Sequence, residues 1–485
     1  MLPPHHTRII ATIGPASDSP EILHRLIEAG VNITRLNFAH GTFEDHAARI
    51  ARIRTAATLA GRPVAILADF PGPKMRLGNI EPEPVQLVAG EKFTLTTANV
   101  IGDTGRASTT FTELPSVVNP GDRLYLNDGL IHLKVEEVEG GEVRCAITVG
   151  GELSSRKGLN LPGIRLGKSA FTDRDRECLE FAIAHGVDAV SQSFVESADD
   201  LAAVREAAGR YGRQPFLIAK IERAGALEAF ESILDAADGI MVARGDLGVE
   251  VPVHEIGLIQ KRLIARANLA GKPVIVATQM LESMIHSRIP TRAEVTDVTN
   301  AILDGTDCVM LSGESAMGKF PVESVSMLAA IAAATEASRP PVRLETMRQA
   351  CGSAHLPEFT RRDAMAELVE TALTKATCPA VFVPTRGGST ARRIARFKPK
   401  AWIVAVSPSH SIRQNLLFSA GVQPVSADGD PSHWRQFARE WVSANGLEGA
   451  HAMLVAGPSP QNPDANHRIE FLPLTVNPNE TLEVD

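Results

Sequence analysis

Short apolar runs alternate with amphipathic segments over roughly the first 340 residues. Runs rich in β-branched or large aliphatic residues stand at 8–14, 31–38, 63–70, 188–194, 216–221, 239–244, 272–279 and 307–313. Such runs are typical of strands buried on both faces of a parallel sheet, and helix-length segments separate most of them. Eight units of this kind predict an α/β fold, a (β/α)₈ TIM barrel. A doubly wound sheet has the same periodicity and stays open as the alternative.

Two parts of the chain break this rhythm. Between 72 and 163, runs such as 91–98, 122–138 and 142–149 alternate polar and apolar residues, which predicts a small inserted β-barrel domain. An insertion after the third barrel strand can close over the site as a lid. After about 342 a linker rich in Pro, Arg and polar residues runs to about 357, and then helix and strand patterns alternate again. We therefore expect a catalytic barrel at 1–71 and 164–342, a β lid at 72–163 and a C-terminal doubly wound α/β regulatory domain at 358–475.

Composition narrows the classes of function. Hydrophobic residues at 44% and charged residues at 22% are ordinary for a globular enzyme, and a net charge of -8 disfavours nucleic acid as the partner. Five widely spaced cysteines without a CxxC pair indicate a reducing compartment, with no zinc site and no disulfide framework. No signal peptide and no apolar run of membrane-spanning length is apparent. The sequence thus predicts a cytoplasmic protein with no membrane partner.

Charged residues close two neighbouring predicted strands. Lys220 and Glu222 end the run that begins at Phe216, and Arg244 and Asp246 follow the next run. Ligands of parallel α/β sheets collect at the carboxyl ends of strands. Two carboxylates and a lysine on one rim can hold a divalent metal beside a cation, which is what phosphoryl transfer requires. For any one of these residues alone, a surface salt bridge is the alternative.

The other strand ends are polar as well, while the familiar nucleotide loops are absent. The stretch 163–169 resembles a Walker A loop but has one residue too few between its glycines, and no GxGxxG follows a strand. The polar residues at the remaining rims are Arg35, Asn37, His40, Asp69, Lys74, Arg76, Thr278, Gln279, Ser312 and Glu314.

Several of these stretches together resemble the pyruvate kinase family. They are ATIGPAS (11–17), RLNFAHG (35–41), KGLNLPG (157–163), AKIERAGALEAFESIL (219–234), DGIMVARGDLGVEVP (238–252), ATQMLESMI (277–285) and the run 290–321. The resemblance implies a phosphotransferase that moves the phosphoryl group of phosphoenolpyruvate to ADP, giving pyruvate and ATP in the last step of glycolysis. It also implies Mg²⁺ or Mn²⁺ as cofactor and a homotetramer.

The resemblance also implies residue roles. Glu222 and Asp246 would bind the divalent metal, Lys220 would neutralise the phosphoryl group in flight, and Arg35 would hold the phosphate. Main-chain N–H groups of Gly245 and Asp246 and the Thr278 hydroxyl would receive the substrate carboxylate. Ser312 and Thr278 would belong to a hydroxyl and water network that protonates the enolate. The nucleotide phosphates would meet Asn37, His40, Arg76, Lys157 and Asp128.

The chain departs from the family pattern near the expected potassium site. Many members have Ser, Thr and Glu where this chain has Ala39, Phe70 and Lys74. Phenylalanine offers no oxygen to a hard cation, whereas Lys74 carries its own positive charge. We therefore expect that K⁺ is not required.

A last motif and two rival functions complete the expectations. TRGGST (385–390) resembles the family's effector loop, so Thr385, Ser389 and Thr390 are candidates to bind the phosphate of a sugar phosphate or AMP. An ordinary turn with a helix cap is the alternative. A metal-dependent aldolase or lyase acting on pyruvate-like enolates, or a non-catalytic metabolite-sensing relative, are the competing functions.

Overall fold

The first part of the chain forms a closed barrel of eight parallel strands. The computed structural model describes residues 2–164, 167, 169–351, 359–426, 433–457 and 467–475. The barrel order is β1-β16-β15-β14-β13-β12-β3-β2, and β2 pairs with β1 as well as with β3, so the sheet closes on itself. The strands are β1 (Arg8–Thr12), β2 (Val31–Asn37), β3 (Ala65–Asp69), β12 (Ala189–Gln192), β13 (Phe216–Ile221), β14 (Gly239–Ala243), β15 (Val274–Ala277) and β16 (Cys308–Leu311). All eight predicted strands are present, and closure of the sheet excludes the doubly wound alternative.

Helices surround the barrel and are fixed at their starts by side-chain caps. Thr42, Thr172, Ser197 and Thr291 each form a capping box with an acid three residues on, which satisfies main-chain N–H groups that the first turn leaves free. The helices are α1 (Pro20–Ala29), α2 (Phe43–Leu59), α4 (Asp173–Ala184), α5 (Ala198–Gly209), α6 (Ala224–Glu228), α7 (Phe230–Ala236), α8 (Arg244–Glu250), α9 (Ile256–Ala270), α10 (Arg292–Leu303), α11 (Gly313–Ala316) and α12 (Pro321–Ser338), with short 3₁₀ turns at Val253–Glu255 and Glu282–Ile285.

The barrel strands are buried on both faces, as their unbroken apolar sequences predict. One apolar cluster, with Ile33, Leu67 and Met241, fills the barrel interior. A larger one, with Ile9, Leu36 and Val242, packs the outer strand faces against the helices. Burial of these surfaces supplies most of the stability of the barrel.

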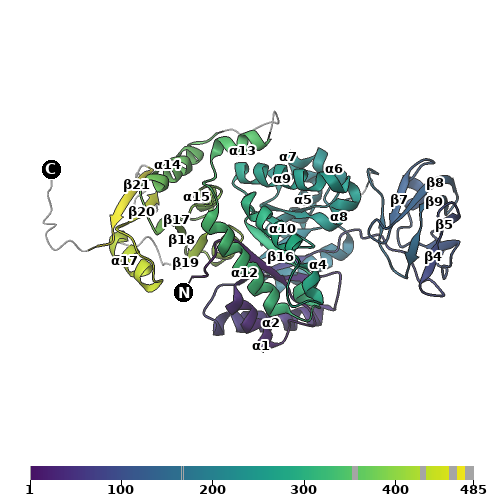
Figure 1. Cartoon of the computed structure of the whole chain (residues 1–485), viewed down its shortest axis with the longest axis horizontal. Coiled ribbons are helices and arrows are strands. Elements are labelled where there is room, and N and C mark those ends of the chain that lie inside the picture. Colours follow the sequence, from purple (N-terminus) through teal and green to yellow (C-terminus); the bar gives the residue numbers. More distant parts are fainter. Residues whose placement is uncertain are drawn as a thin grey trace.

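The segment between β3 and β12 forms sheets of its own. Its elements are β4 (Val85–Leu87), β5 (Lys92–Thr96), β6 (Arg106–Ser108), α3 (Leu114–Val117), β7 (Arg123–Leu126), β8 (Ile131–Glu139), β9 (Glu142–Val149), β10 (Gly151–Leu153) and β11 (Leu159–Asn160). Most of its pairings are antiparallel, and alternate residues face a separate apolar core. Figure 1 shows this inserted domain projecting from the barrel on the side away from the C-terminal domain.

The C-terminal domain is a five-stranded sheet in the order β19-β18-β17-β20-β21. Its elements are α14 (Arg361–Lys375), β17 (Ala380–Pro384), α15 (Ser389–Ala395), β18 (Trp402–Val406), α16 (His410–Leu416), β19 (Val422–Val425), α17 (Trp434–Ala444), β20 (His451–Ala456) and β21 (Arg468–Pro473). Four strands are parallel, while β21 is an antiparallel edge strand that the sequence pattern did not predict. The residue limits of the three domains stay predictions.

A buried polar junction joins the C-terminal domain to the amino ends of the barrel strands. The Lys398 ammonium, fully buried, lies 2.7 Å from Oδ1 of Asp307, just before β16. The same carboxylate oxygen accepts the Ala420 N–H at 2.9 Å, and the Arg8 guanidinium donates to the carbonyls of Ser419 and Val422. These contacts fix the domain at the barrel end opposite to the predicted catalytic rim.

Two predicted segments differ from the structure. The predicted linker contains helix α13 (Leu344–Cys351), because Leu344 and Met347 form a buried apolar face against α9. The helix-length segment between β13 and β14, which the pattern predicts over 226–237, forms two short helices, α6 and α7, that meet at Ala229. Residues 352–358 of the linker, residues 165, 166 and 168 of the Walker-like stretch, and parts of the C-terminal domain lie outside the described residues. Within the described part of the chain, no helix is long and apolar enough to span a membrane.

Candidate active site

The side chain of Lys220 lies at the centre of a buried charge cluster at the carboxyl end of the barrel. It projects from the end of β13, and its Nζ lies 2.8 Å from Oε1 of Glu222 and 3.5 Å from Oδ1 of Asp69. The same ammonium donates to the hydroxyl of Ser193 at 2.7 Å. Burial acts to lower the pKa of Lys220, but the carboxylates of Asp69 and Glu222 raise it above its ordinary value. The amine is therefore a fixed positive charge.

Asp69 connects this ammonium to Arg35. Its Oδ2 accepts from Nε and Nη2 of Arg35 at 3.1 and 2.5 Å, and its Oδ1 accepts from the Ser191 hydroxyl at 2.5 Å. Nη1 of Arg35 donates to the Thr12 hydroxyl at 2.9 Å, which fixes the guanidinium between β1, β2 and β3. Burial acts to raise the pKa of Asp69, but Lys220, Arg35 and Ser191 together lower it to about 2. Asp69 is thus ionised and pairs with both Arg35 and Lys220.

Glu222 and Asp246 form the second half of the cluster. Glu222 is 1% exposed, and its Oε2 accepts the Phe194 N–H at 2.8 Å. Burial raises the pKa of Glu222, Lys220 opposes that rise, and the like charge of Asp246 adds to it. A cation placed beside Glu222 and Asp246 would offset the repulsion between the two carboxylates.

Strained main chain surrounds these residues. Thr278 has a φ of 68° and Phe194 a φ of 58°, both in the left-handed region. The Thr278 hydroxyl accepts the Gly245 N–H at 2.8 Å, and Nη2 of Arg244 donates to the Thr278 carbonyl at 2.7 Å. For a β-branched residue this conformation costs about 1–3 kcal/mol, and such strain gathers at functional sites.

One cavity brings most of the predicted site residues together. Its lining includes the metal and phosphate candidates Arg35, Lys220, Glu222, Asp246 and Thr278. It also includes the nucleotide-side and potassium-site candidates Asn37, Ala39, His40, Phe70, Lys74 and Arg76. Burial lowers the pKa of His40, and Arg76, Lys74 and Arg35 lower it further, so these three cations lie around the imidazole.

Four of the residues predicted to bind substrate or nucleotide or to relay the proton do not line this cavity. Gly245 and Ser312 follow β14 and β16 at the same barrel rim, where the Ser312 N–H donates to Glu314 at 2.7 Å. Lys157 belongs to the chain that returns from the inserted domain, and its carbonyl accepts the Leu77 N–H at 2.9 Å. Asp128 lies in the turn between β7 and β8 with a φ of 54°.

The supporting hydroxyls were missed by the sequence reasoning. Ser191, Ser193 and Thr12 bind the charged residues, yet none was singled out as a site residue. Ser191 and Ser193 lie in and just after β12, within a predicted strand whose carboxyl end carries no charge. A pair of hydroxyls at a strand end is the signal that could have identified them.

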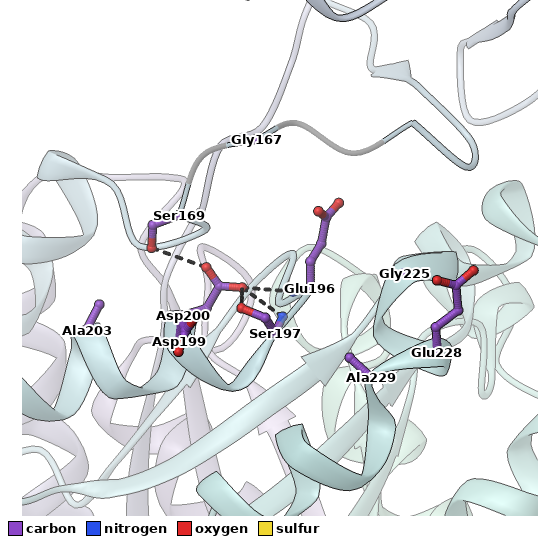
Figure 2. A pocket seen from close by; sticks show the side chains of 10 residues that line it. All are labelled: Gly167, Ser169, Glu196, Ser197, Asp199, Asp200, Ala203, Gly225, Glu228 and Ala229. Carbon is purple, nitrogen blue, oxygen red and sulfur yellow. Dashed lines mark hydrogen bonds between the residues drawn. The ribbon is translucent and has the colours of Figure 1, made fainter.

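A second pocket near the return of the inserted domain has a different character. Figure 2 shows Glu196 and Glu228 extending into it below the segment that carries Gly167. The Asp200 carboxylate is already hydrogen-bonded within the protein, since its Oδ1 accepts from the Ala170 N–H at 2.7 Å and from the Ser169 hydroxyl at 3.2 Å. The described lining of this pocket contains no Lys, Arg or His.

Comparison with known protein families matches two parts of the chain. Residues 4–325 match the model of the pyruvate kinase barrel domain, and residues 363–463 match that of the pyruvate kinase alpha/beta domain. The chain belongs to the pyruvate kinase family. A pyruvate kinase from Thermococcus litoralis is 49% identical over 431 residues, which cover 88% of this chain and 90% of the relative. One from Geobacillus stearothermophilus is 42% identical over 424 residues, covering 87% of this chain and 71% of the relative.

The solved structures agree. The crystal structure of a pyruvate kinase from Cryptosporidium parvum superimposes with a TM-score of 0.88 at 32% identity, covering 97% of each chain. The function of the chain is therefore that of a pyruvate kinase, the transfer of a phosphoryl group from phosphoenolpyruvate to ADP to give pyruvate and ATP.

Pyruvate kinases depend on a divalent metal such as Mg²⁺, and the residues present suit one. Mg²⁺ is typically held by one or two carboxylates, with substrate oxygens and waters as the remaining ligands. Glu222 and Asp246 supply two mutually repelling carboxylates on the cavity wall. No cluster of three or more His, Cys, Asp or Glu ligands occurs in the described residues, so an all-protein metal cage is absent there.

Proposed function

We propose that phosphoryl transfer takes place over Lys220, with Glu222 and Asp246 as the metal ligands and Arg35 as the phosphate clamp. The observation that carries this assignment is the buried Lys220 ammonium 2.8 Å from Glu222, in the cavity that Arg35 and Asp246 also line. A bound divalent cation supplies charge neutralisation to the transferring phosphoryl oxygens. The ammonium lies in a buried site where an electrostatic contact is stronger than in water.

The protein must also orient the phosphoryl donor, phosphoenolpyruvate, and the acceptor, ADP. Arg35 is pre-ordered by Asp69 and Thr12, so little side-chain freedom is lost when a phosphate binds. Gly245 and Asp246 at the start of α8 and the Thr278 hydroxyl would receive the carboxylate of phosphoenolpyruvate. Ser312 and Thr278 would pass a proton to the enolate carbon.

The ADP phosphates would bind on the side of the cavity where positive charge gathers. Asn37, His40 and Arg76 line it, and Lys157 and Asp128 come from the inserted domain. Nη1 of Arg76 donates to the Arg156 carbonyl at 2.9 Å, which ties the two connections of the inserted domain to each other. Movement of that domain would therefore change the position of the nucleotide contacts.

Formation of pyruvate from phosphoenolpyruvate, ADP and Mg²⁺ in a lactate-dehydrogenase-coupled assay tests this assignment of roles. A strict requirement for ADP also separates it from an aldolase or lyase acting on pyruvate-like enolates. A protein that bound phosphoenolpyruvate without turnover would instead be a metabolite-sensing relative.

A potassium-independent reaction is the second part of the proposal. Phe70 is buried and contacts Phe38 edge to face with ring centroids 6.3 Å apart, and Ala39 offers no side-chain oxygen. Lys74 lines the cavity, and no acidic side chain pairs with it within 4 Å among the described residues. Its ammonium would supply the positive charge that K⁺ supplies in other members. Initial rates with and without K⁺ at constant ionic strength test this, and a large requirement for K⁺ refutes it.

The assembly, effector and location also belong to the proposal. We propose that the protein forms a homotetramer. We also propose a cytoplasmic location, in keeping with the five free cysteines. Thr385, Ser389 and Thr390 would bind an effector phosphate, although the Thr385 hydroxyl already accepts the Gly388 N–H at 2.8 Å, as in an ordinary turn. A thermal-shift panel of sugar phosphates and AMP distinguishes the two interpretations, since no shift with any of them favours the turn.

A further inference from the structure

The inserted domain is connected to the barrel by two chain segments that are held in different ways. The outgoing segment is held at Gly72, whose N–H donates to Oδ1 of Asp175 at 3.0 Å. Asp175 is buried and also completes the N-terminal cap of α4 with Thr172. The outgoing connection is therefore fixed to the outer layer of barrel helices.

The returning segment is held by Arg223 instead. Nη2 of this side chain, which is 3% exposed, donates to the carbonyl of Ile164 at 2.7 Å and to that of Leu161 at 3.4 Å. Arg223 directly follows Glu222, the proposed metal ligand, in the loop after β13. A guanidinium on this loop thus binds the main chain by which the inserted domain re-enters the barrel.

Two carboxylates position Arg223. Its Nε forms ion pairs with Oε1 of Glu196 at 3.1 Å and with Oε2 of Glu250 at 3.7 Å. Glu196 is one of the two glutamates that extend into the pocket in Figure 2. The Glu250 side chain is 2% exposed and also accepts the Ala224 N–H at 3.4 Å. Glu250 is the last residue of α8, four residues after Asp246, the other proposed metal ligand.

We propose that Arg223 and Glu250 are positioning residues that couple occupation of the metal site to the position of the inserted domain. The inference rests on the proposed metal ligands. Arg223 adjoins Glu222 in the loop after β13, and Glu250 lies in the same helix, α8, as Asp246. A cation that draws Glu222 and Asp246 together therefore also fixes the pair. The pair in turn fixes residues 161–164. Metal binding and lid position then stabilise each other reciprocally.

Hydrogen exchange of residues 159–164 with and without Mn²⁺ measures this coupling, and Mn²⁺ affinity is measured separately by electron paramagnetic resonance. In the parent enzyme, Mn²⁺ should slow exchange of this segment by about fivefold or more, the lower range of allosteric couplings. In Arg223→Met and in the near-isosteric Glu250→Gln, Mn²⁺ should still bind, but the slowing should be lost. Arg223→Lys retains the positive charge but not the planar guanidinium, so it should retain part of the Mn²⁺-dependent slowing.

Steady-state kinetics give a second readout that a merely structural role would not produce. Because Lys157 and Asp128 reach ADP only from the inserted domain, Arg223→Met and Glu250→Gln should raise KM for ADP about fivefold or more while KM for phosphoenolpyruvate stays near the parent value.

Arg54→Met is the matched control. Arg54 also donates to two carbonyls, those of Val64 at 3.1 Å and Gly186 at 3.0 Å, and pairs with Asp188 at 2.8 Å, but it lies at the amino ends of the barrel strands. This variant should leave the metal-dependent slowing and KM for ADP unchanged.

The outcomes separate this inference from the proposed function. Equal slowing by Mn²⁺ in the parent, Arg223→Met and Glu250→Gln proteins, or no slowing in a parent enzyme that binds Mn²⁺, overturns the coupling. Mn²⁺ binding that survives unchanged in Glu222→Gln overturns the proposed metal ligand instead. If Arg223→Met does not fold, Glu250→Gln carries the same test.

Discussion

Replacement of Lys220 by Met removes the charge at the centre of the proposed site while keeping an unbranched side chain of similar length. The ammonium now contacts Glu222, Asp69 and the Ser193 hydroxyl. Asp69 retains Arg35 and the Ser191 hydroxyl after the change, but Glu222 loses its ion pair. The substitution should therefore affect Glu222 more than Asp69.

The size of the effect follows from this difference. Breaking a buried ion pair costs about 3–5 kcal/mol, and we expect the lower end because Glu222, whose pKa burial already raises, can take up a proton. The catalytic loss should be larger. A cation that stabilises a transferring phosphoryl group contributes about 10³–10⁵ in kcat, so Lys220→Met should lower kcat by about 10³ or more.

The coupled assay measures kcat, and denaturant unfolding measures stability on the same samples. Lys272→Met is the control, because the Lys272 ammonium also makes hydrogen bonds inside the fold, to the carbonyls of Leu234, Asp235 and Ala237, away from the site. It should lose stability and keep kcat. Loss of a single electrostatic donor typically lowers kcat by about 10²–10³. A folded Lys220→Met enzyme with kcat within about tenfold of the parent would therefore refute the assigned role.

Three further predictions concern acid stability, the domain junction and potassium. The pKa of Asp69 is lowered from 3.8 to about 2, so its charged form stabilises the fold above about pH 4, and about 2 kcal/mol should be lost as pH falls from 4 to 2. Asp69→Asn should remove that slope from unfolding curves. Lys398→Met leaves the buried Asp307 carboxylate without its amine and should cost about 3–5 kcal/mol in calorimetry with kcat unchanged. Phe70→Thr combined with Lys74→Glu should make initial rates rise with added K⁺, whereas the parent enzyme should not respond.

The barrel and the charges at its rim could be predicted from sequence because both signals are local. An unbroken apolar run specifies a strand buried on two faces, and a charge at its end must lie where the strand leaves the core. Lys220, Glu222 and Arg35 follow this rule directly. Helix α13 was missed because its Pro- and Arg-rich surroundings obscured the spacing of Leu344 and Met347.

The residues that support the site could not be predicted in the same way. Arg223 and Glu250 are 27 positions apart, and only the folded chain brings Glu250 to Arg223 and Arg223 to the carbonyls of Leu161 and Ile164. Ser193 is an ordinary polar residue until Lys220 lies 2.7 Å from its hydroxyl. The positive φ of Thr278 depends on tertiary contacts such as that from Arg244 and has no marker in a Thr-Gln sequence.

Charge in the catalytic cavity is divided by sign, and this division suits a reaction between two anionic substrates. Burial raises the pKa of Glu222, and the like charge of Asp246 adds to that rise, so this wall favours a cation. On the proposed nucleotide side, burial lowers the pKa of His40 and the charges of Arg76, Lys74 and Arg35 lower it further, so this wall favours phosphate. Lys220 lies where the walls meet, held by carboxylates from both β3 and the loop after β13. A phosphoryl group that crosses from donor to acceptor therefore stays beside positive charge throughout, and the protein need not reorganise to provide it.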